Sequence, residues 1–236
     1  MNFYEEDLQK ALKSKPHLEK RIIILDSIKL YFRSFPLLFF IIFITNLVYL
    51  ISLIFNNYSI YIHLINFFIA IWGISSVINA ANLKYNEEQT TINHCLSLGK
   101  DTHFELLITT VLYLLKIVFG LILLVIPGMY WSIKLSLAPI ASVLQKTHLK
   151  NPFQISRDFT KGFMLDIFII FFLLFALLAF LYSLPFTLLE NFTHLRKYFI
   201  FIINLIFTSY ALTLFVIIYN RLEQIKMNEN VALGKK

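Results

Sequence analysis

Between Ser34 and Leu83 the chain carries no charged side chain, and this run constrains the fold more than any other feature. It is long enough for two membrane crossings of about 20 residues each. A soluble core of this length would present a charged outer face to water, and this segment has none. Over the whole chain 58% of residues are hydrophobic and 15% are charged, whereas soluble domains are about 45–50% apolar and about 25% charged. The sequence therefore predicts an all-α, polytopic membrane protein.

The apolar segments predict six transmembrane helices joined by short polar connections. We expect these helices over residues 36–55, 60–81, 105–125, 129–146, 163–184 and 198–220. They form a membrane domain of residues 22–225, between a polar lead, 1–21, and a polar tail, 226–236. Amphipathic segments at 22–35, 90–100 and 147–162 precede three of the helices, and we expect them to be short interfacial helices.

The positive charges predict the orientation of the domain. Of the 21 Lys and Arg residues, only Arg196 and Lys197 fall on one side, and only Lys116 and Lys134 lie deep inside predicted helices. Since basic residues stay in the cytoplasm, we expect both termini there. The lead lacks the apolar core of a signal peptide, and the bias toward Phe, Ile, Lys and Asn is typical of an A- and T-rich bacterial genome. We expect a bacterial inner-membrane protein, and the positive-inside rule explains the net charge of +7 without nucleic acid.

Two of the interfacial segments share a basic and aromatic pattern. Lys29 and Arg33 precede the first predicted helix much as Arg157 and Lys161 precede the fifth. An internal repeat of three units, each an interfacial helix followed by a membrane hairpin, would explain the likeness. A general preference for basic and aromatic residues where helices enter from the cytoplasm would explain it equally. In both cases we expect these four residues to lie at the membrane interface.

The stretch from Ile126 to Pro139 holds the strongest candidates for a site. Pro127-Gly128 predicts a tight turn between the third and fourth helices, and Pro139 predicts a kink in the fourth. Lys134 would lie about 10 Å and 16 Å from the two ends of that helix, close to the bilayer centre. A lysine there costs about 2.5–3.5 kcal/mol on an insertion scale. We therefore expect the fourth helix to be packed inside the bundle.

Lys116, deep in the third predicted helix, is the second candidate. No acidic residue is predicted at matching depth, so the two lysines suggest an anionic guest such as a lipid headgroup or phosphate. Pro127, Gly128 and Pro139 would then shape the pocket around Lys134. The alternative is that each lysine extends its stem to the interface or bonds a backbone carbonyl.

The sequence contains no recognisable catalytic or metal-binding motif. The six histidines show no ligand spacing, and the single cysteine, Cys95, excludes an intramolecular disulfide and a Cys-based metal site. The patterns H-E-x-x-H, G-x-S-x-G, Walker A and G-x-G-x-x-G do not occur. We expect no enzymatic activity, no metal and no cofactor.

Two neighbouring stretches resemble a known family. They are Val125–Pro139, V-I-P-G-M-Y-W-S-I-K-L-S-L-A-P, and Asn151–Phe163, N-P-F-Q-I-S-R-D-F-T-K-G-F. Both are similar to the core of the YciC-type bacterial inner-membrane proteins and to the membrane domain of some glycerophosphodiester phosphodiesterases. Ile218–Leu222 resembles the family's closing tyrosine-arginine segment. The resemblance covers roughly residues 22–225. It implies an association with envelope and lipid homeostasis, and, without the soluble phosphodiesterase domain, no hydrolase activity.

Three functions remain open at this point. The first is a non-enzymatic inner-membrane protein that engages anionic lipid, with Lys134 as the headgroup contact, and supports envelope or lipid homeostasis. The second is a small transporter or permease subunit for an anionic solute, with Lys116 and Lys134 along its path. The third is a structural membrane partner of another complex. The expected partners are membrane lipid and a protein partner or a second copy of the chain.

Overall fold

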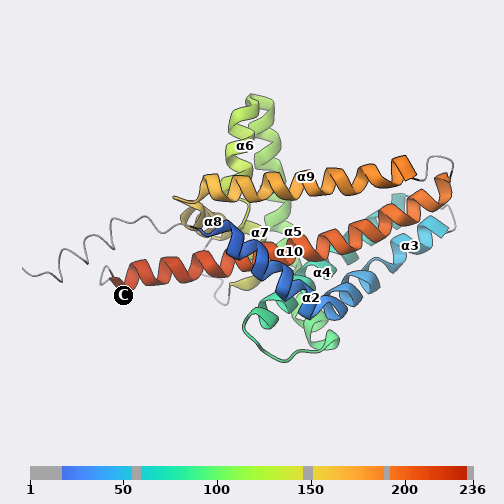
Figure 1. Cartoon of the computed structure of the whole chain (residues 1–236), viewed down its shortest axis with the longest axis horizontal. Coiled ribbons are helices and arrows are strands. Elements are labelled where there is room, and N and C mark those ends of the chain that lie inside the picture. The colour runs from blue at the N-terminus through green and yellow to red at the C-terminus, as the bar shows by residue number, and fades with distance from the viewer. Residues whose placement is uncertain (1–17, 55–59, 146–150, 189–191, 233–236) are drawn as a thin grey trace, which may run out of the picture.

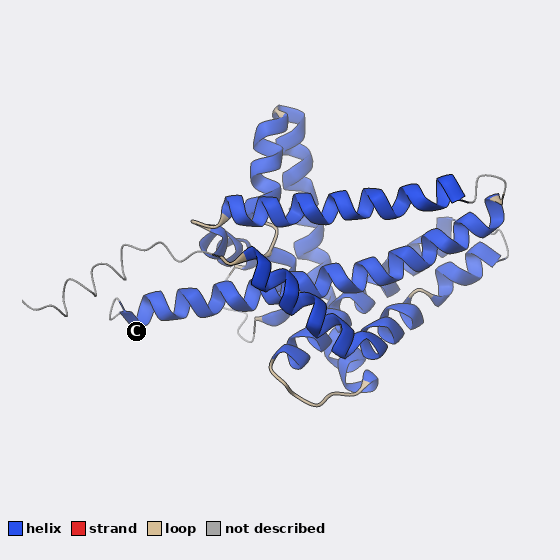
Figure 2. Cartoon of the chain, in the orientation of Figure 1, coloured by secondary structure: helices blue, strands red, loops and turns tan. Residues whose placement is uncertain are grey.

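The computed structural model describes residues 18–54, 60–145, 151–188 and 192–232 of the 236-residue chain. Within these ranges the chain is almost entirely helical and forms no strand (Figure 2). The helices are α2 Lys20–Thr45, α3 Leu47–Ile54, α4 Ile60–Tyr85, α5 Ile92–Leu123, α6 Val125–Lys134, α7 Ala138–Leu144, α8 Pro152–Thr160, α9 Met164–Leu188 and α10 Thr193–Ala232. The all-α prediction is confirmed.

Five helices are long and apolar enough to cross a membrane, namely α2, α4, α5, α9 and the Leu195–Glu229 part of α10. In α9 the apolar residues occupy every face of the helix, a pattern typical of helices that contact lipid or a large core. Leu165, Phe172 and Phe175 of α9 are 76%, 63% and 70% exposed. Lipid is the solvent that suits such a surface, so the chain is a membrane-embedded, multi-pass protein.

Two of the predicted interfacial helices are not separate elements. α2 runs through the predicted segment 22–35 into the first apolar segment, and α5 includes residues 92–100 of the predicted segment 90–100. α10 likewise continues beyond residue 220 into the predicted tail. These boundaries were wrong because a change from an amphipathic to an apolar pattern marks new surroundings and does not end a helix. The predicted span 36–55 is divided instead, since Asn46 separates α2 from α3.

The largest difference between the prediction and the structure concerns the predicted fourth span, 129–146. Its described part, residues 129–145, contains the end of α6 and all of α7, which meet at a turn of residues 135–137. Neither helix has the roughly 20 residues that a crossing requires. The count of six spans is therefore not confirmed.

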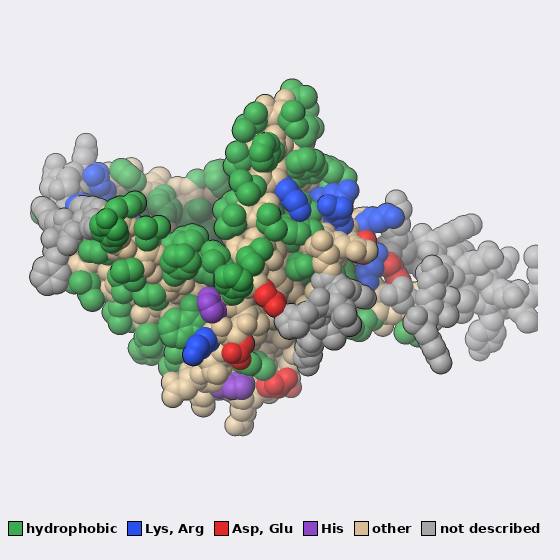
Figure 3. All heavy atoms as spheres, turned by 180° about the vertical axis from the view of Figure 1, so that it is seen from behind, with side chains coloured by type: hydrophobic (Ala, Val, Ile, Leu, Met, Phe, Trp, Pro, Cys, Tyr) green, Lys and Arg blue, Asp and Glu red, His purple; other side chains and the backbone are tan. Residues whose placement is uncertain are grey.

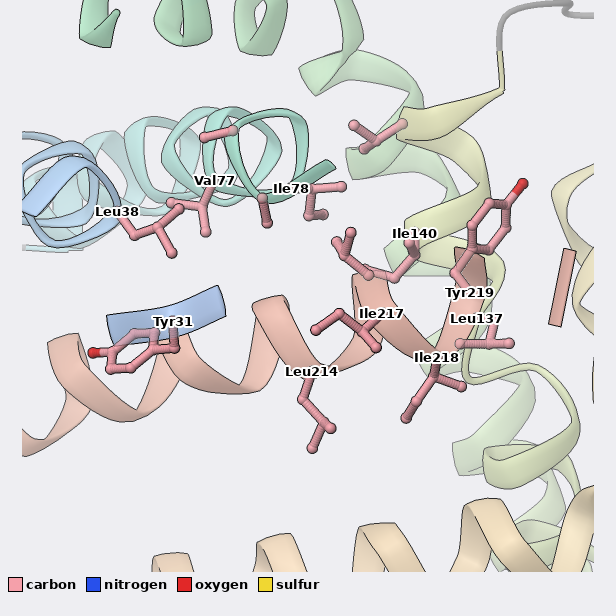
Figure 4. Packing of buried hydrophobic residues seen from close by; sticks show 14 of the residues in the cluster. Tyr31, Leu38, Val77, Ile78, Leu137, Ile140, Leu214, Ile217, Ile218 and Tyr219 are labelled. Carbon is pink, nitrogen blue, oxygen red and sulfur yellow. The ribbon is translucent and has the colours of Figure 1, made fainter. Parts of the chain in front are cut away.

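α7 lies in the centre of the bundle although it is the shortest helix described. Ala138, Ile140 and Ala141 of α7 are buried, and α7 packs against α4, α5, α8 and α10. The surrounding core includes Leu38 of α2, Val77 and Ile78 of α4, and Ile217 of α10 (Figure 4). The expectation that the fourth predicted helix is packed inside the bundle is thus met by α7 alone.

The far end of α5 and α6 form a hairpin, residues 113–134, that projects from the bundle. In Figure 1 this α5–α6 hairpin stands across α9 and α10, which run lengthwise beside each other. The residues at its tip are the most exposed apolar side chains on it: Ile122, Leu123, Leu124 and Ile126 are 74%, 70%, 69% and 80% exposed. The base of the hairpin, where α6 meets α7 and α8, is where the candidate residues lie.

Candidate functional site

The break between α6 and α7 is completed by a third helix, α8. A broken helix leaves backbone groups without partners, which is tolerated at membrane depth only where protein or a polar cavity satisfies them. Ser156 Oγ donates to the carbonyl of Lys134 at 3.0 Å and accepts from the N–H of Leu137 at 3.2 Å. Thr160 Oγ1 lies 3.2 Å from the same Lys134 carbonyl. One serine thus bridges both sides of the break, and α8 acts as its cap.

Pro139 starts a helix and does not kink one. It occupies the first turn of α7, where its missing N–H would have no intrahelical partner in any case. The freed backbone groups lie just before it, at the turn that Ser156 bridges. The prediction of a kinked continuous helix was wrong for this reason.

Pro127 and Gly128 do not form the hairpin turn either. The turn is at Leu124, whose backbone is extended, and both residues lie in the first turns of α6. Gly128 contributes by close approach: a Cβ built on Gly120 of α5 would lie 2.9 Å from the Cα of Gly128. The two glycines let α5 and α6 cross closely. Gly120 was missed in the sequence because a single glycine in an apolar helix gives no pattern.

Lys134 is the last residue of α6, and its predicted position near the bilayer centre depended on a continuous helix that does not exist. A helix C-terminus carries partial negative charge and favours a cation. The Lys134 ammonium donates to the Tyr130 hydroxyl at 2.8 Å and lies 4.8 Å from the centre of that ring. The Lys134 side chain therefore has a partner within α6, and its backbone carbonyl accepts hydrogen bonds from Ser156 and Thr160 of α8 at the break.

Lys116 contacts α8 through an aromatic ring. Its Nζ lies 3.4 Å from the centre of the Phe153 ring, a cation–π contact. Phe153 is held at the start of α8, where Asn151 caps the helix by accepting from the Phe153 N–H at 3.0 Å. Arg157 lies one turn further along α8. The contact therefore places the Lys116 ammonium against the helix that carries Arg157.

The structure brings Lys116 and Lys134 to the same short helix but shows no direct contact between them. We call Lys116, Lys134 and Arg157 the basic site. In the described part of the chain none of the three forms a salt bridge with a carboxylate. Figure 3 shows Lys and Arg side chains gathered at the base of the hairpin, whose own surface is hydrophobic. This end of the molecule therefore carries basic side chains, with acidic ones beside them, next to an apolar surface (Figure 3).

The other predicted interfacial residues lie elsewhere. Lys161 is the exposed C-cap residue of α8, next to the basic site in sequence. Lys29 and Arg33 of α2 line a separate cavity of about 380 Å³, and Arg33 lies 3.9 Å from Glu87. The four residues therefore do not form one surface, which the sequence pattern could not show.

A large apolar cavity adjoins the basic site. It measures about 920 Å³ and lies between the hairpin and helices α9 and α10. Six phenylalanines line it: Phe168, Phe171, Phe172, Phe175, Phe207 and Phe215. We call it the aromatic cavity. The sequence could not reveal it, because these residues resemble any other lipid-facing residues of α9 and α10.

Tyr113 joins the aromatic cavity to the basic site. Its side chain lines the cavity, and its hydroxyl donates to the carbonyl of Ser132 on α6 at 3.1 Å. The same ring packs against the cluster of Leu135, Ala138 and Phe153. The Phe153 ring also forms the cation–π contact with the Lys116 ammonium. Phe153 therefore connects Tyr113, which lines the aromatic cavity, to the Lys116 cation.

The chain matches none of the known protein families, curated proteins or solved structures with which it was compared. Across the residues that the structure describes, no group of three or more His, Cys, Asp or Glu side chains could hold a metal ion.

Proposed function

We propose that this chain is a non-enzymatic membrane protein that holds an anionic lipid, with acyl chain in the aromatic cavity and headgroup at the basic site. The observation that carries the proposal is the junction at Tyr113 and Phe153, where a 920 Å³ apolar space adjoins the Lys116 cation, which forms no salt bridge with a described carboxylate. Ligand pockets in proteins measure about 300–1,000 Å³, and the volume of the aromatic cavity falls within this range.

The sign of the charge supports an anionic headgroup. Lys116 contacts Phe153 of α8, Arg157 lies one turn further along the same helix, and neither forms a salt bridge with a described carboxylate. Each basic residue near a membrane surface attracts anionic lipid by about 1 kcal/mol. Lys134 contributes less, because Tyr130 already accepts a hydrogen bond from its ammonium. Lys116 therefore replaces Lys134 as the leading headgroup contact.

The identity of the membrane and the side on which the termini lie are part of the same proposal. The distribution of Lys and Arg supports both termini in the cytoplasm, and the bias toward Phe, Ile, Lys and Asn supports a bacterial inner membrane. The resemblance to the YciC-type family supports a role in envelope or lipid homeostasis. In this proposal α8 closes the gap between α6 and α7.

Native mass spectrometry after reconstitution in equimolar phosphatidylglycerol and phosphatidylethanolamine tests the proposal. Wild type should retain phosphatidylglycerol preferentially, and Lys116→Leu should reduce this retention about fivefold, the equivalent of about 1 kcal/mol. Lys100→Leu, an exposed lysine at the other end of α5, is the matched control. Equal retention of phosphatidylglycerol by wild type and Lys116→Leu would refute the headgroup assignment.

A further inference from the structure

Two other cavities lie along the contact between α4 and α10, away from the lipid site. The first, the Asn66 cavity, measures about 300 Å³ and is lined by Asn46, Asn66, Asn204 and Thr208 among its polar residues. The second, the Asn82 cavity, measures about 500 Å³. Its carboxamides come from Asn82, Asn86, Gln145, Asn220 and Gln224, and its one charged lining residue is Glu223. Such concentrations of amides are unusual in an apolar bundle, where polar side chains are costly and tend to be functional.

The two cavities are in register on both helices. Asn66 and Asn204 line the first cavity, and Asn220 Nδ2 donates to Asn82 Oδ1 at 2.9 Å in the second. The spacing from Asn66 to Asn82 equals the spacing from Asn204 to Asn220. At 1.5 Å per residue this spacing is about 24 Å, which is most of the hydrocarbon thickness of about 30 Å. One polar cavity thus lies toward each end of the crossing.

Between the cavities the contact is closed by apolar side chains. Leu38 of α2 and Val77 and Ile78 of α4 belong to the hydrophobic core packed at this contact (Figure 4), and each has no exposed surface. Ile217, equally buried, comes from α10. Apolar constrictions of this kind gate pores by excluding water. We call these four residues the apolar plug.

The chemistry of the Asn66 cavity indicates what it can take. Its lining contains no charged residue, so a bare ion would find no counter-charge in a medium of low dielectric. Asn66 Oδ1 is buried and has no hydrogen-bond partner among the described residues. Asn204 Oδ1 accepts from the Tyr182 hydroxyl, which leaves its amide N–H groups to donate. The cavity therefore offers both an acceptor and donors to an uncharged solute.

We propose that the α4–α10 contact is a gated path for small uncharged polar solutes, such as polyols and amides. A solute exchanges its water for the carboxamides of the Asn66 cavity, passes when the apolar plug becomes hydrated, and leaves through the Asn82 cavity. This inference does not depend on the lipid site, because none of the residues that line the two cavities belongs to the basic site or the aromatic cavity.

Stopped-flow light scattering of proteoliposomes tests the path, with glycerol and urea as permeant probes and sucrose as the excluded one. Val77→Ser places a hydroxyl in the plug and should accelerate glycerol entry at least about fivefold over protein-free liposomes. Val118→Ser, at a half-exposed position on α5, is the matched control and should have no effect. Adding Asn66→Leu to Val77→Ser should return glycerol entry to the basal rate, whereas adding the exposed Asn93→Leu should not.

Gel filtration verifies that each variant folds, and Val77→Thr, which preserves side-chain volume, replaces Val77→Ser if the latter does not elute as a single peak. Glycerol entry no faster than in the Val118 control would overturn the proposal. Entry of sucrose as fast as glycerol would also overturn it, since that would be an unselective leak.

Discussion

The bundle core and the α5–α6 hairpin are both strongly apolar, yet they use their side chains in opposite ways. In the core, small and polar residues are buried between helices: Ser27, Thr45, Ser75, Ser76, Ser209 and Thr213 are all at most 1% exposed. On the hairpin and α9, large apolar side chains point outward. Lipid is as apolar as leucine, so helices in a membrane associate through close packing and hydrogen bonds. The core is therefore specified by its small residues, and the hairpin keeps its apolar surface for lipid or a ligand.

The largest loss of stability is expected from a large residue placed in the core, where helices depend on close packing. A Cβ built on Gly99 of α5 would lie 2.0 Å from Ser76 Oγ and 2.8 Å from the Ser76 backbone on α4. Gly99→Leu must therefore separate the two helices, at a cost above the 1–3 kcal/mol of ordinary overpacking, roughly 4 kcal/mol. We expect the variant to lose its single gel-filtration peak. A wild-type elution profile and thermal midpoint would contradict the close contact.

Removing the cap of the helix break should have the next largest effect. Ser156→Ala leaves the Lys134 carbonyl with Thr160 alone and the Leu137 N–H without its partner. A buried unsatisfied group costs about 1–3 kcal/mol, and unfolding in graded SDS should show a loss of this size. Ser183→Ala on the exposed face of α9 is the control. Equal stability of the two variants would show that α8 does not cap the break.

A large residue in the hairpin should disturb the hairpin alone, whereas a large residue in the core should destabilise the whole bundle. In Gly120→Leu the new side chain meets Gly128 of α6, so the hairpin opens while α2, α4, α7 and α10 keep their contacts. We expect a thermal midpoint close to that of wild type together with about tenfold less retained phosphatidylglycerol, since the aromatic cavity loses one wall. A global loss of fold would mean that the hairpin is part of the core.

The smallest effect is expected at the hairpin tip. Leu123 is 70% exposed, so Leu123→Ala removes no packing in the protein and should change stability by no more than about 0.5 kcal/mol. SDS unfolding measures this change. A loss of about 2 kcal/mol or more, typical of a buried leucine, would show that the tip is covered, for instance by a second copy of the chain.

The sequence predicted the helical membrane fold well because long apolar runs have few other solutions. It failed where a helix ends without changing its composition. Residues 129–146 look continuous, since the break at residues 135–137 has no glycine and is stabilised by Ser156, a partner distant in sequence. Pro139 indicated that the helix is interrupted, but not whether it is kinked or ends and starts again. Lys116 and Lys134 were found as isolated charges, whereas Phe153, Tyr113 and the aromatic cavity depend on which helix faces meet.

The most direct test of the account is photo-crosslinking with a phosphatidylglycerol that carries a photoreactive group on its acyl chain. The account predicts that the label attaches to the lining of the aromatic cavity, on α9 near Phe171 and Phe175 and on α6 near Met129. Lys116→Leu should reduce this labelling while phosphatidylethanolamine of the same design labels weakly. Labelling spread evenly over α2, α4 and α9, and unchanged in Lys116→Leu, would contradict a specific lipid site.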